Sequence, residues 1–264
     1  MTAATCSASP ATDREGVDEM IRTLLVRGMG VGLAAALLAF AFSFLVGEPQ
    51  VGRAIDLEAQ AASAAGVAEE PEVVSRTVQR TVGLATAVGL YGLAMGGLFG
   101  IAFAVAYGRI GSFGPRAAAG LLAIGGFVSV QLVPFLKYPP NPPAVGNPDT
   151  IGRRTALYLL LLVISVLAAL AAVSFGRRAA AGYGNWNAAL LAVGGFVALV
   201  VLAYVALPGV DEVAGGFPAT LLWRFRLASL GTQAVLWTTL GLLFGALTER
   251  SLQDRRRQPA AAAR

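Results

Sequence analysis

Six apolar segments, each long enough to cross a bilayer, constrain the fold of this 264-residue chain more than any other feature. A membrane-spanning helix needs about 20 mostly apolar residues to match a hydrocarbon core of about 30 Å. The centres of the segments lack Asp, Glu, Lys and Arg, which cost at least about 2.5 kcal/mol each at mid-membrane. We therefore predict an all-α membrane protein with six transmembrane helices, at residues 24–46, 82–107, 117–136, 155–175, 187–207 and 227–247.

The composition agrees with a membrane domain and excludes several kinds of site. Hydrophobic residues make up 56% of the chain and charged residues 13%, against about 25% charged residues in soluble domains. The chain has no histidine, which removes imidazole zinc sites and histidine-based triads, and its single Cys6 cannot form an intramolecular disulfide. The net charge of +5 lies at helix ends rather than in a folded basic patch, so we predict no nucleic-acid partner.

Basic residues predict how the chain is oriented. The two ends of the chain and the second and fourth connections hold more Lys and Arg than the first, third and fifth connections. The positive-inside rule then places both termini in the cytoplasm, as an even number of spans requires. We expect one transmembrane domain at residues 23–250, between a flexible cytoplasmic tail at 1–22 and a basic, disordered tail at 251–264.

A short internal similarity suggests a duplicated helical hairpin. Residues 121–128 read LLAIGGFV and residues 190–197 read LLAVGGFV, and arginines precede both of the helices that come before them. The second and third predicted helices would then form one copy and the fourth and fifth another, related as parallel repeats by an axis along the membrane normal. The alternative is a chance match in a chain rich in Ala, Gly and Leu.

Small residues at four-residue spacing predict where helices pack. Lipid is as apolar as leucine, so helices in a membrane associate through close approach of their backbones rather than through exclusion of apolar surface from water. The expected packing positions are Gly28 and Gly32, then Gly92, Gly96 and Gly100, and finally Gly241 and Gly245.

Charged residues gather in the three long outer connections, and they have two interpretations. The arginines pair with loop carboxylates and brace the mouth of the bundle, or they form a charged vestibule that concentrates or filters a solute. The outer candidates are Glu48, Asp56, Glu58, Arg76, Arg80, Asp149, Arg153, Arg154, Asp211, Glu212, Arg224 and Arg226, with Glu69, Glu70 and Glu72 as further pairing carboxylates.

A few polar groups remain as candidates for direct contact with a solute. Gln131, Thr232 and Gln233 lie at membrane depth, where they form interhelical hydrogen bonds or line a pathway. Glu48, Asp56 and Glu58 offer oxygen ligands that suit divalent cations only weakly, so we assign no metal site. The proline-rich run YPPNPPAVGNP predicts a stiff polyproline-like strap. Neither a credible catalytic base or nucleophile nor an ATP-binding loop is present, so we predict that the chain is not an enzyme.

The strings in the outer connections resemble the CbtA family. They are GEPQVGRAIDLEA, VSRTVQRTVGL, FLKYPPNPPAVGNPDTIGRRTALY and FPATLLWRFRLASLGTQ, and the likeness covers about residues 22–250. The resemblance implies a multi-pass protein of the bacterial inner membrane that takes part in cobalt uptake, with cobalt as a transported substrate rather than a cofactor. It also implies a partner, CbtB, a small single-helix subunit with a histidine-bearing end.

One difference from the family leaves the source of imidazole ligands open. Family members commonly carry histidines in the first outer loop, where this chain reads AQAASAAGVAEEPE. The partner supplies every imidazole, or this chain handles cobalt weakly. The leading hypothesis is therefore a subunit of a cobalt uptake system whose outer loops form the vestibule, and the alternative is a scaffold that holds partner subunits or lipid without transporting.

Overall fold

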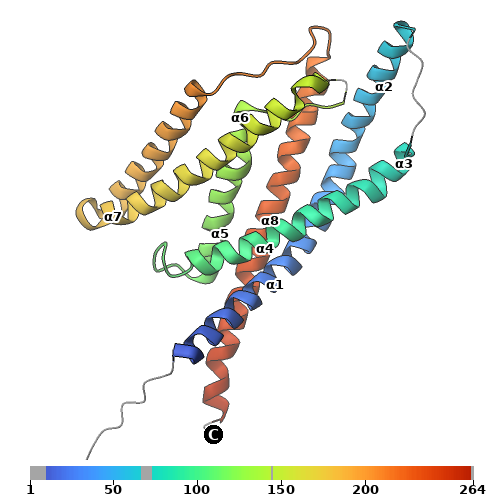
Figure 1. Cartoon of the computed structure of the whole chain (residues 1–264). Coiled ribbons are helices and arrows are strands. Elements are labelled where there is room, and N and C mark those ends of the chain that lie inside the picture. Colours follow the sequence, from blue (N-terminus) through green and yellow to red (C-terminus); the bar gives the residue numbers. More distant parts are fainter. Residues whose placement is uncertain (1–9, 67–72, 144, 263–264) are drawn as a thin grey trace, which may run out of the picture.

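The computed structural model describes residues 10–66, 73–143 and 145–262, and all regular structure in these residues is helical. Cys6, Glu69, Glu70 and Glu72 lie outside the described residues. Five helices are long and apolar enough to cross a membrane, and the structure therefore confirms an all-α chain with several membrane-competent helices. Figure 1 shows them as a bundle in which α1 (Pro10–Phe42) begins and α8 (Ala219–Ala262) ends at the same end.

The first three membrane-competent helices each contain a short π-helical segment. The first consists of α1, η1 (Ser43–Gly47) and α2 (Glu48–Ala64), and the second of α3 (Arg76–Val78), η2 (Gln79–Gly83) and α4 (Leu84–Ala106). The third consists of α5 (Pro115–Gly126), η3 (Phe127–Leu132) and α6 (Val133–Lys137). The one-turn 3₁₀ helix η4 (Pro148–Thr150) then precedes α7 (Ile151–Ala206). A π-helical turn holds one residue more than an α-turn and is frequent at functional sites.

The prediction that the chain leaves its first helix near residue 47 is wrong. The helix continues through η1 into α2, so Glu48, Asp56 and Glu58 stand on a helix and not in a loop. Pro49 is tolerated because it lies in the first turn of α2, directly after the π-helical segment. The following residues are mostly Ala, Leu, Glu and Gln, which are strong helix formers. Asp56 and Glu58, two residues apart, therefore point to different sides of α2.

Helix α7 contains both the fourth and the fifth predicted segments. Its backbone leaves helical geometry at Gly184, where φ is 74° and ψ is 162°. A positive φ is a conformation that glycine adopts at little cost. Figure 1 shows α7 folding back on itself there, so that residues 151–183 and 185–206 form two antiparallel arms, which we call the first and second arms.

The closest packing joins α1 to α4. A Cβ added at Gly28 would lie 2.2 Å from the carbonyl oxygen of Gly96, and one added at Gly32 would lie 2.1 Å from that of Gly92. A Cβ at Gly241 of α8 would lie 2.7 Å from the Cβ of Ala123 in α5. The predicted small-residue packing is thus confirmed, and it pairs α1 with α4 and α5 with α8.

Aromatic side chains fill the space between these two helix pairs. The ring of Phe99 in α4 meets those of Trp237 and Phe244 in α8 edge to face, at centroid distances of 6.4 and 5.3 Å. Phe103 adds a further edge contact with Phe244 at 5.0 Å. Such pairs contribute about 0.5–1.5 kcal/mol each beyond the area they bury. This cluster is the main core, and it holds α4 against α8.

The two arms of α7 lie beside the rest of the bundle and contact it at one end. A second, smaller cluster joins Val133 of α6 to Leu161 of the first arm and Ala203 of the second. The Tyr204 hydroxyl donates to the carbonyl of Val133, and Lys137 Nζ donates to the carbonyl of Tyr204 at 2.8 Å. Residues 121–128 and 190–197 lie in different surroundings, on α5 and η3 and on the second arm, so the hairpin repeat stays a prediction.

Candidate functional site

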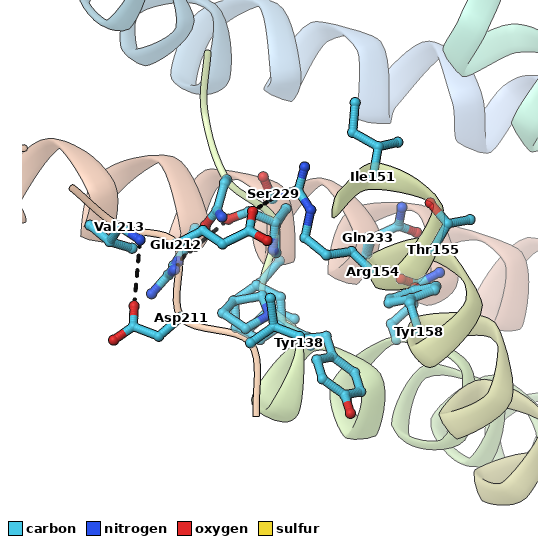
Figure 2. Close-up of a pocket in the computed structure, with 18 residues that line it drawn as sticks. Tyr138, Ile151, Arg154, Thr155, Tyr158, Asp211, Glu212, Val213, Ser229 and Gln233 are labelled. Carbon is cyan, nitrogen blue, oxygen red and sulfur yellow. Dashed lines mark hydrogen bonds and ion pairs between the residues drawn. The ribbon is translucent and has the colours of Figure 1, made fainter. Parts of the chain in front are cut away.

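A cavity of about 470 Å³ opens where α6, the first arm of α7 and α8 meet the loops at one end of the bundle. It has a polar rim and a largely apolar wall, and Figure 2 shows its lining side chains. Most of the wall comes from residues 131–141, 151–158 and 226–233, which are the end of the third membrane-competent helix with the residues directly after it, the first turns of α7, and the third and fourth turns of α8. Residues 210–213 of the connection before α8 complete the rim.

The cavity brings together six of the fifteen outer and membrane-depth candidates, which are widely separated in the sequence. Those that line it are Gln131, Arg154, Asp211, Glu212, Arg226 and Gln233. Asp149 and Arg153 are exposed close by in the sequence but do not line it. Thr232 also lies outside the lining, and its hydroxyl donates to the carbonyl of Ala228 one turn earlier in α8.

The remaining candidates lie on the α2 side of the bundle. Arg76 forms an ion pair with Glu48 at 2.5 Å, which joins the start of α3 to the start of α2. The Arg80 guanidinium carbon lies 5.9 Å from the centre of the Phe44 ring. Glu58 is exposed, and Asp56 and Arg224 line a second groove between α2 and α8. The outer charges therefore form separate sites and not a single ring.

Glu212 fastens two connections together at the rim of the cavity. Its Oε1 accepts a 2.5 Å hydrogen bond from the Thr150 hydroxyl, and its Oε2 lies 3.1 Å from Arg154 Nη1 and 3.2 Å from the backbone nitrogen of Asn147. The hydrogen bond from Thr150, then that from Asn147 and the charge of Arg154 lower the pKa of the Glu212 carboxyl below its ordinary value of 4.5. Both of its oxygens are engaged, so Glu212 has a bracing role.

Asp211 differs from its neighbour in its contacts. It accepts a single hydrogen bond, from the backbone nitrogen of Val213 at 3.4 Å, and among the described residues it has no ion pair within 4.0 Å. Its charge acts on Arg226 over a longer distance. In Figure 2 the dashed line from Asp211 leads to Val213, while Glu212 faces Arg154. Asp211 is therefore the cavity carboxylate with oxygen atoms available to a solute.

The proline-rich strap forms one wall of the cavity and is held there by Arg226. Arg226 donates to the side-chain oxygen of Asn141 at 2.9 Å and to the carbonyl of Pro140 at 3.4 Å. At the start of the strap, the Tyr138 hydroxyl donates to the carbonyl of Pro208 at 2.8 Å. These bonds connect the third connection of the chain to the fifth connection and to α8.

Amide groups from two helices form the floor. Gln131 Nε2 donates to the Tyr91 hydroxyl at 2.7 Å, and that hydroxyl donates to Gln233 Oε1 at 3.3 Å. Tyr91 belongs to α4, Gln131 to η3 and Gln233 to α8, so one hydroxyl joins three helices. Since Gln131 uses its amide nitrogen for this bond, its Oε1 is the atom that remains for a solute.

The local backbone explains how Gln131 reaches the floor. Pro134, which is buried, has no N–H to donate to the residue four positions earlier, and its ring would clash there in a regular α-helix. The π-helical segment η3 comes directly before it and relieves this clash by widening the turn. Gln131 lies inside that widened turn.

Several residues of the site were missed by the sequence reasoning. Tyr91 lies within the apolar run GLYGLAMGG, and a tyrosine there resembles an ordinary core or interface residue. Tyr158 and Ser229, which also line the cavity, carry no local signal either. A hydroxyl at the centre of an otherwise apolar span was the available signal for Tyr91, because such a group needs a partner in lipid.

The cavity offers no tight metal site. Among the described residues there is no group of three or more His, Cys, Asp and Glu side chains that could hold a metal ion together. The formal negative charges of the two carboxylates in the cavity equal the positive charges of its two arginines. Oxygen ligands without imidazole or thiolate bind cations such as cobalt weakly.

The family model of the probable cobalt transporter subunit CbtA matches residues 21–249. The chain belongs to the CbtA family. This match covers all five membrane-competent helices except for a few residues at the ends, and it confirms the resemblance seen in the outer strings. The CbtA assignment agrees with a multi-pass membrane protein, and transporter subunits are typically not enzymes. Neither a curated protein nor a solved structure matches the chain.

Proposed function

We propose that this chain is the membrane-embedded subunit of a cobalt uptake system and that the cavity is its outer vestibule. The family match supports the transport of cobalt, and the cavity supports the location. The observation on which the proposal rests is the convergence of Asp211, Gln131 and Gln233 on one space that reaches from the outer loops to membrane depth.

The proposal includes six spans in a bacterial inner membrane. The two arms of α7, divided at Gly184, act as separate spans, so that the five long helices make six crossings. An even number agrees with α1 beginning and α8 ending at one end of the bundle. With the positive-inside bias, both termini are cytoplasmic and the cavity faces outward.

In the vestibule, Asp211 attracts the hydrated cation and the amide oxygen of Gln131 replaces part of its water shell. A conducting site must bind strongly enough to admit an ion and weakly enough to release it. One available carboxylate, the Gln131 oxygen and the balanced arginines meet that requirement. We propose that the cobalt ion passes as a substrate and that a CbtB-like subunit supplies the imidazole ligands that this chain lacks.

The test is accumulation of radioactive cobalt in cells that express this chain with and without its partner. Asp211→Asn is expected to lower the initial uptake rate at low cobalt several-fold, because it removes the available carboxylate. The matched control is Asp149→Asn, an exposed outer carboxylate that does not line the cavity, which is expected to leave uptake unchanged. Equal uptake by the Asp211→Asn variant and the control would overturn the assignment of the vestibule.

A scaffold without transport activity is the alternative. It is favoured by the exposed apolar face of α7, including Leu167, Leu170 and Val201, which covers lipid or a partner subunit. In that case Asp211→Asn and Asp149→Asn would both leave cobalt uptake unchanged, while leucine at Gly92 and Gly96 would break assembly with the partner.

A further inference from the structure

A second groove, between α2 and the first turns of α8, carries charges that have no ion-pair partner among the described residues. Arg53, Asp56 and Gln60 line it from one face of α2, and Thr220 and Arg224 line it from α8. Its volume is about 410 Å³. The groove is separate from the cavity described above, and the proposed uptake function does not use it.

The charges of the groove lie close together in the fold without pairing. Arg53 and Asp56 are three residues apart on one helix, a spacing that permits an ion pair. In the part of the chain that the structure describes, neither these two nor Arg224 makes an ion pair within 4.0 Å or a side-chain hydrogen bond. Two guanidinium groups and one carboxylate therefore face a space that a ligand with both signs of charge would fill.

The groove begins in the headgroup layer of the outer leaflet and extends outward from it. The first charged residue beyond the apolar part of the first helix is Glu48, and Arg53 stands five residues further, about 7.5 Å at 1.5 Å per residue. On α8 the apolar segment begins after Arg226, so that Arg224 lies about 4.5 Å further out than residue 227. The headgroup layer is about 5–7 Å thick on each side of the hydrocarbon core. Arg224 therefore lies within the headgroup layer, and Arg53 lies at its outer edge.

Asp56 lies about one helical turn further from the hydrocarbon than Arg53. This order from the membrane outward, with two guanidinium groups followed by a carboxylate, is complementary to a phosphate followed by an ammonium group. Trp223, next to Arg224, is 63% exposed, and an exposed tryptophan at the end of a span is typical of the lipid interface. These positions favour a lipid over a dissolved phosphate ester.

We propose that this groove binds the headgroup of an amine-bearing phospholipid, with Arg53 and Arg224 on the phosphate and Asp56 on the primary ammonium. Arginine binds phosphate through two parallel, charge-assisted hydrogen bonds. A primary ammonium group can donate hydrogen bonds to the Asp56 carboxylate, whereas the trimethylammonium of a choline lipid cannot. The groove therefore distinguishes phosphatidylethanolamine from phosphatidylcholine.

The experiment compares these two lipids, with identical acyl chains, added to the full-length chain in detergent micelles. The thermal unfolding temperature is followed by tryptophan fluorescence, and bound lipids are counted by native mass spectrometry. Phosphatidylethanolamine is expected to raise the unfolding temperature more than phosphatidylcholine and to remain bound. Asp56→Asn is expected to make the two lipids equivalent, and Arg53→Gln combined with Arg224→Gln is expected to remove the response to both.

The matched control is Arg153→Gln, which removes an exposed outer arginine that does not line the groove and should respond like the unaltered chain. Equal shifts for the two lipids in the unaltered chain would overturn the proposal. A double arginine variant that still retains phosphatidylethanolamine would also overturn it. A full shift with inorganic phosphate or phosphoethanolamine in place of lipid would assign the groove to a soluble anion and refute the lipid.

Discussion

Replacing Gly96 by alanine tests whether the contact between α1 and α4 governs the stability of the bundle. The added Cβ would lie 2.2 Å from the Gly28 carbonyl oxygen and 2.7 Å from the Gly32 Cα. Both are backbone atoms, so no side-chain rotation relieves the overlap. Ordinary contact begins at 3.4 Å, so α1 has to move about 1.2 Å away along this contact. A gap of that size removes at least about half of the dispersion energy along the contact.

The expected cost follows from two opposing effects. Overpacking of a well-packed contact costs about 1–3 kcal/mol, and a contact between two backbones lies at the upper end of this range. Replacing glycine by alanine inside a helix stabilises the helix by up to about 1 kcal/mol. We therefore expect Gly96→Ala to destabilise the chain by about 2 kcal/mol, which corresponds to a fall of about 4–8 °C in unfolding temperature for a domain of this size.

The assay is thermal unfolding of the purified chain in detergent, followed by tryptophan fluorescence. Trp237 is 6% exposed and packs against Phe99 of α4, so its emission reports the separation of α4 from α8. Gly89→Ala is the matched control, because it lies on the same helix with nothing within 4 Å of an added Cβ. It should unfold at the original temperature or slightly above. Equal unfolding temperatures for the two variants would refute the reasoning.

Three further predictions concern the site and the turn of α7. Tyr91→Phe removes the hydroxyl that forms hydrogen bonds with Gln131 and Gln233. Cobalt uptake should therefore fall several-fold while the unfolding temperature changes little. Retention of the full uptake rate would show that Tyr91 does not orient the two glutamines. Glu212 has a lowered pKa when folded, so its stabilising contribution is present above its ordinary value of 4.5 and is lost as the pH falls through the lowered value. The drop in unfolding temperature on acidification below 4.5 should therefore be smaller in Glu212→Gln than in the unaltered chain, and the same drop in both would contradict the bracing role. Gly184→Ala forces a residue with a Cβ into a φ of 74° and a ψ of 162°, a conformation essentially restricted to glycine, at a cost of about 1–3 kcal/mol. This cost should appear as faster proteolysis between the arms of α7, with Gly182→Ala, which has no positive φ, as a control.

The sequence predicted the packing between helices better than it predicted the connections. Glycines four residues apart mark a close approach whatever the partner is, because only the absence of side chains permits it. The partners themselves, Gly28 with Gly96 and Gly241 with Ala123, depend on the tertiary fold. The continuation of the first helix into α2 was hidden by Glu48 and Pro49, which are typical of a span end but are also compatible with the first turn of a helix.

The sequence predicted which charged residues belong to the outer surface, but not which of them lie together in the cavity. Arg154, Asp211 and Arg226 were recognised as outer residues, because charge is excluded from the apolar segments. Which carboxylate pairs and which stays available depends on loop geometry, since Glu212 meets Thr150 only through the fold of two distant connections. The floor residue Tyr91 was missed because its role arises from two glutamines on other helices.

The contact between α1 and α4 also sets which residues face each other at the outer end of the bundle. The two helices run antiparallel, and sixteen residues separate Gly32 from Glu48, as sixteen separate Arg76 from Gly92. Because Gly32 meets Gly92 at one end, the equal lengths of about 24 Å bring Glu48 to Arg76 at the other.

Each of these lengths contains one π-helical segment, η1 or η2, so the extra residue in one helix is matched by an extra residue in the other. Deleting one residue from either segment alone would leave fifteen residues opposite sixteen. Deleting one from both would keep the lengths equal. The two irregular turns are thus compensating insertions, and the register of the outer surface is set by their balance.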